Sequence, residues 1–512
     1  MISKVYTCAL MGINGLIIEV ETDISNGLPG FTIVGLPDAA VKESKERVRS
    51  SIRNSGYNYP VKKITVNLAP ADVRKIGPCY DLPIAIGILA STGQVLMSDI
   101  SDYVFLGELS LDGRVKPVNG VLCMAAEAER KGYKKIIVPF KNANEAAIVK
   151  GIEIYPVSTL KEAIEILNNP TGCLPYEPEK NIYNSQLRFY DDFLDIKGQE
   201  SAKRALEIAA AGGHNIVMIG PPGSGKTMLA QRLPGILPDM SREEAIEITK
   251  IYSITGYLDP ENGIVDNRPF RSPHHTITSI SLVGGGKVPR PGEVSLAHNG
   301  VLFLDELPEF HRDALEVLRQ PIEDGRVNVS RVNGSLTFPS SFMLIASMNP
   351  CPCGFFNDPV RECTCNPVSI RKYLGKISGP LLDRIDIHIE VYPVKYDDLE
   401  TEAAGESSDI IRKRVNEARK RQLKRYKDYN IYCNAQLSAA MIKKYCKIND
   451  ESKKMMKSVF ERLGLSARAY NKILKVARTI ADIEGEENIN TSHIAEAIQY
   501  RSMDRKYWES GM

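Results

Sequence analysis

The residues with the clearest chemical signature form a glycine-rich segment that can hold the phosphates of a nucleotide. The segment fits G-x-x-x-x-G-K-[ST] at every fixed position. Its glycines let backbone N–H groups face phosphate oxygens, Lys226 can reach the β- and γ-phosphates, and the Thr227 hydroxyl can ligate Mg²⁺. The candidate nucleotide-binding residues are Gly220, Pro221, Pro222, Gly223, Ser224, Gly225, Lys226 and Thr227.

Two carboxylates follow an apolar run further along the chain. The run Val301–Leu304 predicts a buried strand, and Asp305 and Glu306 come directly after it. Asp305 would hold Mg²⁺, and Glu306 would polarise the attacking water as a general base. An apolar run ending in Asp-Glu is a weak signal alone, but together with the phosphate loop it indicates magnesium-dependent ATP hydrolysis.

The elements that must position these residues can be predicted from hydrophobic patterns. A strand over 215–219 precedes the phosphate loop, a helix over 228–233 follows it, and another strand is expected over 342–346. Buried strands that alternate with helices are typical of a parallel sheet. The nucleotide site is therefore expected on an α/β domain.

Composition separates the chain into three domains and a linker. Residues 1–168 alternate β-branched runs with helical patterns and predict an α/β domain, and 169–190 are rich in Pro and polar residues and predict a linker. Residues 191–395 form the predicted ATPase core. Residues 396–512 are almost free of Gly and Pro and predict a helical domain.

Overall composition excludes several classes of protein. The 512 residues are 43% hydrophobic and 25% charged, which is typical of globular chains rather than fibrous or disordered ones. The net charge of +2 gives no indication of partners. No apolar stretch reaches the roughly 18 residues that a membrane span needs. The ten cysteines lack the spacing of a secreted disulfide framework, so we expect a cytoplasmic protein.

The order of these motifs resembles an AAA+ ATPase. In that family a polar residue ends the strand after the Asp-Glu strand, and Asn349 matches this sensor 1 position. Residues 379–386 resemble the arginine-finger segment of the magnesium-chelatase and MCM branch, which implies that Arg384 reaches the γ-phosphate of a neighbouring subunit. Arg468 matches sensor 2. The resemblance implies a ring, with six subunits expected; surface ion pairs are the alternative role for either arginine.

Four further segments, 35–38, 66–72, 270–275 and 283–286, resemble the YifB/ComM group of magnesium-chelatase-like AAA+ proteins. The resemblance covers essentially the whole chain. It implies a Lon-protease-like N-terminal α/β domain, a P-loop AAA+ core and a C-terminal helical lid. It also implies a hexameric DNA helicase that promotes branch migration during natural transformation.

The likeness to Lon breaks down at the residues that would do chemistry. Gly77-Pro78-Cys79 resembles the segment of the Lon nucleophile, but Cys79 stands where Lon has Ser. Leu122 falls where we would place the catalytic lysine. A nucleophile without a base to activate it is a poor catalyst, so a peptidase is disfavoured.

Two predicted loops carry basic residues that could meet DNA. Residues 325–338 predict a hairpin with its turn at Asn333-Gly334. The resemblance to MCM-type ATPases implies that Arg331, near the tip, points into a central channel, and that Lys287 and Arg290 of a second loop line it too. Solvated charges on exposed hairpins are the alternative. The basic run 412–427 could be a DNA surface, a solvated face or a subunit contact.

A cysteine cluster follows Asn349 directly. Cys351, Cys353, Cys363 and Cys365 form C-x-C-x9-C-x-C, and four thiolates on two short arms could hold a tetrahedral Zn²⁺. Free thiols and a redox pair remain open. His274 and His275 could sense nucleotide or DNA, or could be ordinary hydrogen-bonding histidines.

Three functions are compatible with these features. The first is an ATP-driven DNA motor for branch migration. The second is a chelatase-type remodeller that acts on a protein partner without DNA. The third is a Lon-like peptidase, which Leu122 disfavours.

Overall fold

The fold was determined from a computed structural model. It describes residues 2–95, 100–170, 172–178, 191–286, 288–331, 334–358, 361–394, 405–429, 431–463, 466–501, 503 and 507.

The chain divides into two compact units. Unit 1 consists of Met1–Ser185 and Arg242–Asp266, and unit 2 of Gln186–Ser241 and Asn267–Met512. The sequence predicts that Arg242–Asp266 belongs to the ATPase core, residues 191–395. In the structure this segment is part of unit 1. The helical C-terminal region shares unit 2 with the nucleotide-binding sheet.

Unit 1 is built on a seven-stranded sheet in the order β3-β4-β2-β1-β5-β8-β9. The pairs β1–β2 and β2–β4 are antiparallel, whereas the pairs β1–β5, β5–β8 and β8–β9 are parallel. The strands are β1 Ile2–Met11, β2 Asn14–Ser25, β3 Gly30–Val34, β4 Lys63–Ala69, β5 Tyr103–Phe105, β8 Lys135–Pro139 and β9 Glu153–Val157. A short hairpin of β6 Glu108–Leu109 and β7 Val115–Lys116 accompanies the sheet.

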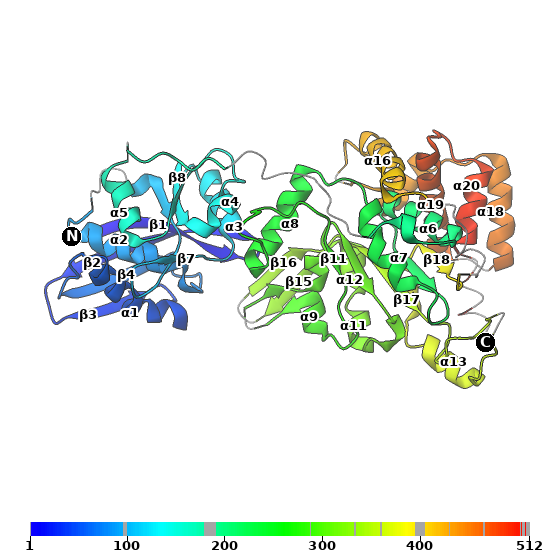
Figure 1. Ribbon diagram of the computed structural model, residues 1–512, viewed down its shortest axis with the longest axis horizontal. Helices are drawn as coiled ribbons and strands as arrows, with labels where there is room; N and C mark the ends of the chain where they lie inside the picture. Colours follow the sequence, from blue (N-terminus) through cyan, green and yellow to red (C-terminus); the bar gives the residue numbers. More distant parts are fainter. Residues whose placement is uncertain are drawn as a thin grey trace. The chain divides into compact units, whose positions relative to one another are not determined.

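Helices cover both faces of this sheet (Figure 1), because its side chains alternate between two apolar clusters. Tyr103 and Phe105 join one cluster with α1, α2 and α5, whereas Val104 joins the other with α3 and α4. The helices are α1 Ala39–Asn54, α2 Asp81–Ser91, α3 Val121–Arg130, α4 Ala143–Ala146 and α5 Leu160–Asn168. Helices α1 and α3 lie within residues 1–168, where the sequence predicts helical patterns.

Helix α8, Arg242–Thr255, belongs to unit 1 although its neighbours in sequence belong to unit 2. It packs on α3 and buries Ala245, Ile248 and Ile251. The Ser253 hydroxyl hydrogen-bonds the buried carboxylate of Glu145. An apolar helix stripe needs a partner surface, and the sequence pattern does not say which surface that is.

Unit 2 contains a five-stranded parallel sheet in the order β11-β14-β17-β10-β18 (Figure 1). The strands are β11 Phe270–Arg271, β14 Val301–Leu304, β17 Met343–Met348, β10 Ile216–Ile219 and β18 Ile387–Glu390. Residues of β10, β14 and β17 are buried throughout, as expected for a parallel sheet covered on both faces. The three strands predicted for this region are confirmed.

The helices around this sheet are short. They are α6 Glu200–Gly212, α7 Lys226–Arg232, α9 Ser279–Val283, α10 Glu293–Leu296, α11 Arg312–Glu316, α12 Arg319–Asp324, α13 Pro367–Leu374 and α14 Gly379–Leu382.

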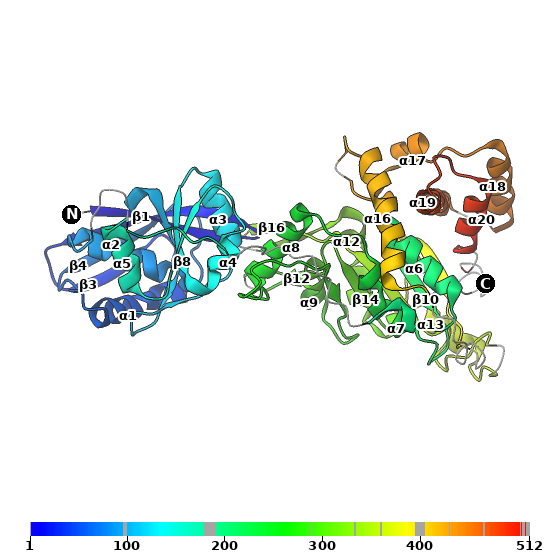
Figure 2. The same cartoon turned by 45° about the horizontal axis from the view of Figure 1, so that its top comes forward.

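The C-terminal region is helical in its described residues. Its helices are α16 Ser408–Arg425, α17 Ala439–Tyr445, α18 Asp450–Leu463, α19 Ala467–Glu484 and α20 Thr491–Gln499. Helices α16 and α19 pack against each other and against α6, as Figure 2 shows for α16 and α6. The core of the ATPase sheet therefore continues into these helices without a break.

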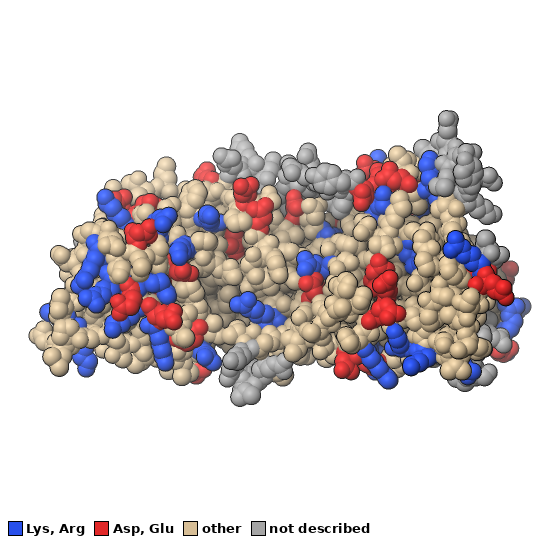
Figure 3. Space-filling view, turned by 60° about the horizontal axis from the view of Figure 1, so that its bottom comes forward, with Lys and Arg blue, Asp and Glu red and all other residues tan. Residues whose placement is uncertain are grey.

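Most of the arginines in α16 face the protein. Arg414 pairs with Glu207, Arg425 pairs with Asp482, and Arg421 donates to the carbonyl of Asp482. Arg421 and the lysines of this run are exposed, so the interpretation of 412–427 as a DNA surface, a solvated face or a subunit contact stays a prediction. On the face of the molecule in Figure 3, basic and acidic side chains are interspersed. No described helix is long and apolar enough to cross a membrane.

Two hairpins extend from unit 2. Strands β15 Arg326–Arg331 and β16 Gly334–Pro339 pair in antiparallel register, as do β12 Gly284–Gly285 and β13 Arg290–Pro291. Gly334 pairs with Arg331 and so begins β16, which corrects the predicted turn at Asn333-Gly334. Cross-strand register, rather than the dipeptide, sets the turn. Val332, Asn333 and Lys287 lie outside the described residues.

Candidate nucleotide site

The phosphate loop connects the end of β10 to the start of α7. Its backbone has left-handed conformations at Gly223 (φ 78°) and Gly225 (φ 84°), which favour glycine. A Cβ on Gly220 would lie 2.1 Å from the carbonyl oxygen of Val391 in the neighbouring chain segment after β18. The glycines of the motif are thus required by backbone conformation and by close packing.

Lys226 is the buried cation of the site. Its Nζ donates to the carbonyls of Gly220 (2.8 Å) and Pro221 (2.9 Å) and lies 3.3 Å from Oδ1 of Asn349. Burial lowers the pKa of Lys226 to about 8, although the charges of Asp305 and Glu306 oppose the shift. A desolvated ammonium group is strongly attracted to an anionic phosphate.

Thr227 and Asp305, the two predicted magnesium ligands, are in direct contact. The Thr227 hydroxyl donates to Oδ2 of Asp305 at 2.8 Å, and the Ser347 hydroxyl donates to its other oxygen. The contact between Ser347 and Asp305 results from neighbouring parallel strands, since Asp305 follows β14 and Ser347 lies in β17. Hydroxyl and carboxylate oxygens that converge in this way fit Mg²⁺, which prefers hard oxygen ligands.

Glu306 projects from a left-handed backbone position (φ 54°) beside Asp305. Its N–H donates to Oδ1 of Asp305 (3.0 Å) and its side chain is 60% exposed. Nδ1 of His275 lies 3.8 Å from Oε2 of Glu306, and the His275 ring contacts His274 and Phe310. The carboxylate is therefore accessible to water and to substrate.

The two predicted arginines lie close to one another. Arg384 pairs with Glu323 of α12 and donates to the carbonyl of Pro380, whereas Arg468, 65% exposed, lies 3.6 Å from Asp383. None of these partners belongs to the phosphate loop of the same chain.

Two of the residues predicted to meet DNA, Arg331 and Arg290, lie on the two hairpins. Arg331 ends β15, and Arg290 is an exposed residue of β13. The structure thus brings together Lys226, Thr227, Asp305, Glu306 and Asn349 at one edge of the sheet, and places the DNA candidates on separate hairpins.

Three residues of the site were missed by sequence reasoning. Gln199 donates to the carbonyls of Ser224 (2.7 Å) and Tyr392 (3.1 Å), Ser347 bonds Asp305, and the Tyr373 hydroxyl lies near the backbone N–H of Asn349. The only local signal was the position of Ser347 just before sensor 1. The other two contacts join segments that are distant in sequence.

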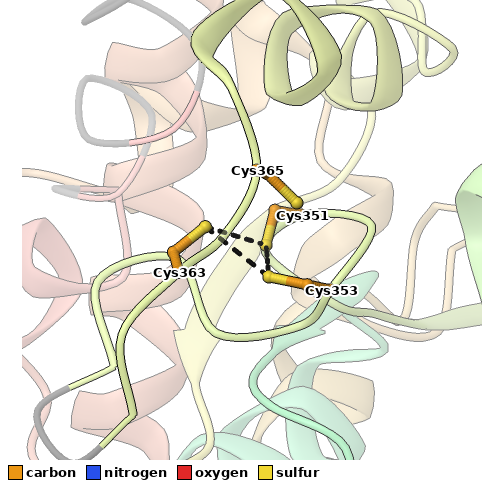
Figure 4. A group of neighbouring side chains, drawn as sticks. All are labelled: Cys351, Cys353, Cys363 and Cys365. Carbon is orange, nitrogen blue, oxygen red and sulfur yellow. Dashed lines mark hydrogen bonds between the residues drawn. The ribbon is translucent and has the colours of Figure 1, made fainter.

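The four predicted zinc ligands are assembled. Their sulfur atoms all lie within 4.8 Å of one another (Figure 4). Cys351 is 3.3 Å from Cys353 and 3.7 Å from Cys363, and Cys353 is 3.6 Å from Cys363. Zinc–sulfur bonds of about 2.3 Å in a tetrahedron require sulfur separations of roughly 3.8 Å, so the cluster is close to the needed geometry.

The Lon-like segment of unit 1 is organised differently. Burial raises the pKa of Cys79 to about 12, so its sulfur is a neutral thiol. Leu122 is buried, and its N–H donates to Glu145 at 2.8 Å.

Family models match three successive parts of the chain. "Subunit ChlI of Mg-chelatase" matches residues 20–142, "Magnesium chelatase, subunit ChlI" matches 192–399, and "Magnesium chelatase, subunit ChlI C-terminal" matches 405–501.

Full-length relatives extend this similarity. YifB of Escherichia coli (strain K12) is 45% identical over 506 residues, which cover 98% of each chain. Competence protein ComM of Haemophilus influenzae (strain Rd) is 45% identical over 506 residues, 98% of this chain and 97% of ComM. Lon protease 2 of Bacillus subtilis (strain 168) is 32% identical over 145 residues, 27% of this chain and 25% of the protease. With the motifs of the nucleotide site in place, the chain belongs to the YifB/ComM family of magnesium-chelatase-like AAA+ proteins.

Proposed function

We propose that this protein is an ATP-dependent DNA motor that works as a hexameric ring. It would drive branch migration and so promote the integration of incoming DNA during natural transformation. The single observation that carries the ATPase part is the convergence of Lys226, Thr227 and Asp305 at one edge of the parallel sheet. The similarity to a protein named for competence supports the DNA part.

The residues divide the work of ATP hydrolysis. Backbone N–H groups of the phosphate loop and Lys226 bind the phosphates, and Glu306 orients the attacking water and accepts its proton. Mg²⁺, held by Thr227 and Asp305, would neutralise developing charge on the phosphates. Asn349, already 3.3 Å from Lys226, would position the water from the adjacent strand.

Subunits of a ring would complete each other's sites. Arg384 would stabilise the transition-state charge on the nucleotide of a neighbouring subunit, and Arg468 would contact the γ-phosphate from the helical lid formed by residues 396–512. The neighbourhood of Arg384 and Arg468, linked through the segment that contains Asp383, supports this role.

DNA would pass through the ring in contact with the two hairpins. Arg331, Lys287 and Arg290 would track phosphates without reading the sequence, so binding would weaken as salt rises. Single-stranded or branched DNA is the proposed partner.

The alternative is a chelatase-type remodeller that uses the same ATPase core on a protein partner. The match of all three family models to magnesium-chelatase subunits favours this candidate.

The two functions separate in a hydrolysis assay. ATP turnover is measured without DNA and with single strands, linear duplex or a four-way junction, at low and moderate salt. A DNA motor is stimulated by single strands or junctions, and the stimulation fades with salt. Hydrolysis indifferent to every DNA, without DNA binding at low salt, would exclude the motor.

One substitution makes this assay sharper. Arg331→Ala should bring the ratio of DNA-stimulated to DNA-free hydrolysis close to one. Arg326→Ala, at the opposite end of the same strand β15, is the matched control and should leave the ratio unchanged. Equal ratios for wild type and both variants would remove Arg331 from the DNA path.

The N-terminal domain, residues 1–168, would have a Lon-protease-like fold without peptidase activity. The partial similarity to Lon protease 2 supports the fold, and the neutral thiol of Cys79 together with Leu122 supports the lack of activity. Residues 169–190 would be the linker to the ATPase core, 191–395.

We also propose that Cys351, Cys353, Cys363 and Cys365 hold Zn²⁺. Their sulfur separations support a tetrahedral site. Metal analysis of the purified full chain tests this: one zinc per chain is expected, and a protein without bound metal would contradict it.

A further inference from the structure

The cysteine segment, residues 350–366, connects the sensor 1 residue to helix α13. Asn349 precedes it at the end of β17, and α13 follows it. The Tyr373 hydroxyl of α13 lies near the backbone N–H of Asn349. The segment therefore leaves from the residue whose side chain contacts Lys226, and the helix that follows it comes back near that residue.

The same segment packs directly on the phosphate loop. Gly354 lies against the ring of Pro222, so that a Cβ on Gly354 would come within 2.4 Å of Cδ of Pro222. Gly220 and Pro221 of the phosphate loop share the wall of one cavity with Pro350, Gly354 and Phe356 of the cysteine segment.

The cluster of thiols is what holds this segment together. Its described residues, 350–358 and 361–366, form turns and extended chain without a helix or strand. Backbone N–H groups lie near the sulfurs, among them those of Phe355 and Thr364 near Cys353 and that of Gly354 near Cys351. Sulfurs surrounded by donors are suited to carry the negative charge of metal-bound thiolates.

We propose that a metal ion held by the four cysteines braces the phosphate loop, so that nucleotide affinity depends on metal in this cluster. The proposal rests on the nucleotide-binding function given above and on the zinc site. It assigns the metal a defined mechanical task, which is to keep Gly354 against Pro222 and Asn349 beside Lys226.

The physical reason is the cost of ordering a loop. Metal binding supplies the free energy that fixes a segment too small to have its own apolar core. Without the ion, the segment loses its internal tie, and the phosphate loop loses the surface behind Pro222. Nucleotide binding must then order both segments, and its affinity falls.

The contact between Gly354 and Pro222 can be tested with the metal still bound. Gly354→Ala keeps all four cysteines but forces a methyl group into the Pro222 ring. Overpacking of this kind should weaken binding of a fluorescent ADP analogue with Mg²⁺ by about tenfold. Gly132→Ala is the matched control, because Gly132 has nearly the same backbone strain (φ 89° against 87°) and nothing within 4 Å of its added Cβ.

Removal of the clash should restore binding. In a Pro222→Ala background the Cγ and Cδ atoms that meet the added methyl are gone, so Gly354→Ala should then cost much less affinity than in wild type. Equal costs in both backgrounds would mean that the effect does not pass through this contact.

The metal is tested with Cys363→Ser, and Cys173→Ser is the control from unit 1. Metal content and ADP affinity are measured on the same full-length samples under reducing conditions. Cys363→Ser should lose the metal and bind ADP at least about tenfold more weakly, whereas Cys173→Ser should match wild type.

Each result decides a separate part of the proposal. A metal-loaded Gly354→Ala protein that binds ADP as tightly as wild type would overturn the brace, as would a metal-free Cys363→Ser protein with full affinity. A wild type that binds ADP but contains no metal would overturn the metal's role and leave the ATPase proposal intact. A metal-loaded wild type that binds no nucleotide would overturn the proposed function, and the brace with it.

Discussion

Units 1 and 2 both place helices on the two faces of a sheet with parallel strands, but their candidate sites differ in kind. In unit 2, Thr227 hydrogen-bonds Asp305, Lys226 donates to two carbonyls of the phosphate loop, and Glu306 beside them is exposed. In unit 1, the position that matches the Lon nucleophile is Cys79, a neutral thiol, and Leu122 is buried in the core. Similar backbone segments can therefore surround either a reactive site or packed side chains.

The two sites differ in the protonation state and the solvent exposure of their side chains. These properties separate them more clearly than the resemblance of a chain segment to a catalytic motif does. Burial in unit 2 lowers the pKa of Lys226 to about 8, yet the amine still carries its charge near neutral pH. Burial in unit 1 raises the pKa of Cys79 to about 12, so its thiol does not ionise to the thiolate near neutral pH. The same desolvation thus leaves one group charged and the other neutral at neutral pH.

The largest effect should come from the general base of unit 2. Glu306→Gln keeps the shape of the side chain but cannot accept a proton, so the rate constant for ATP hydrolysis should fall by about 10² to 10⁴ while nucleotide still binds. The readout is steady-state phosphate release with a parallel ADP-binding titration. Glu309→Gln, an exposed carboxylate three residues on, is the control. Unimpaired turnover by Glu306→Gln would remove the contrast between the units.

The second effect is a pH dependence of nucleotide affinity. Phosphate binding favours the protonated amine, and the pKa of Lys226 in the free protein is about 8. Affinity should therefore be highest below pH 8 and fall by up to about tenfold per pH unit above it. Binding of the ADP analogue between pH 6.5 and 9.5 measures this. Lys226→Arg stays protonated throughout and should show a flatter profile. Equal slopes for both proteins would assign the titration elsewhere.

A smaller effect concerns helix α8, which belongs to unit 1 although its neighbours in sequence belong to unit 2. Ser253→Ala removes the hydroxyl that hydrogen-bonds the buried Glu145, so the free energy of unfolding of unit 1 should fall by about 1 kcal/mol. Calorimetry of the full chain should show a lower transition temperature for unit 1 and an unchanged one for unit 2. Ser101→Ala, an exposed serine of unit 1 outside α8, is the control. A shift confined to unit 2 would contradict the assignment of α8.

The smallest effect should be that of Cys79. Cys79→Ala should change ATP hydrolysis by less than about twofold, because the thiol is neutral and belongs to the other unit. Casein cleavage should be at background for both proteins. Peptide hydrolysis that is present in wild type and lost in the variant would show that unit 1 holds a second active site. It would contradict the contrast between the two units.

Local patterns were sufficient for the elements and for the ATP motif. The strands before the phosphate loop and before Asp305 were predicted because apolar runs must be buried, and the loop was predicted because phosphate binding needs glycines and a lysine at fixed spacing. The cysteine spacing likewise predicted that four thiols could meet. These inferences depend on neighbours along the chain, which a sequence displays directly.

Contacts between distant segments were decided by the tertiary structure alone. The packing of α8 on α3, the pairing of the α16 arginines with Glu207 and Asp482, and the contact of Gly354 with Pro222 each join residues far apart in sequence. An amphipathic stripe or a basic run specifies that a face must be covered or neutralised, but not by which partner. That choice depends on the shape and charge of the whole folded unit. The sequence by itself therefore determined the chemistry of the nucleotide site, and only the fold decided what supports it.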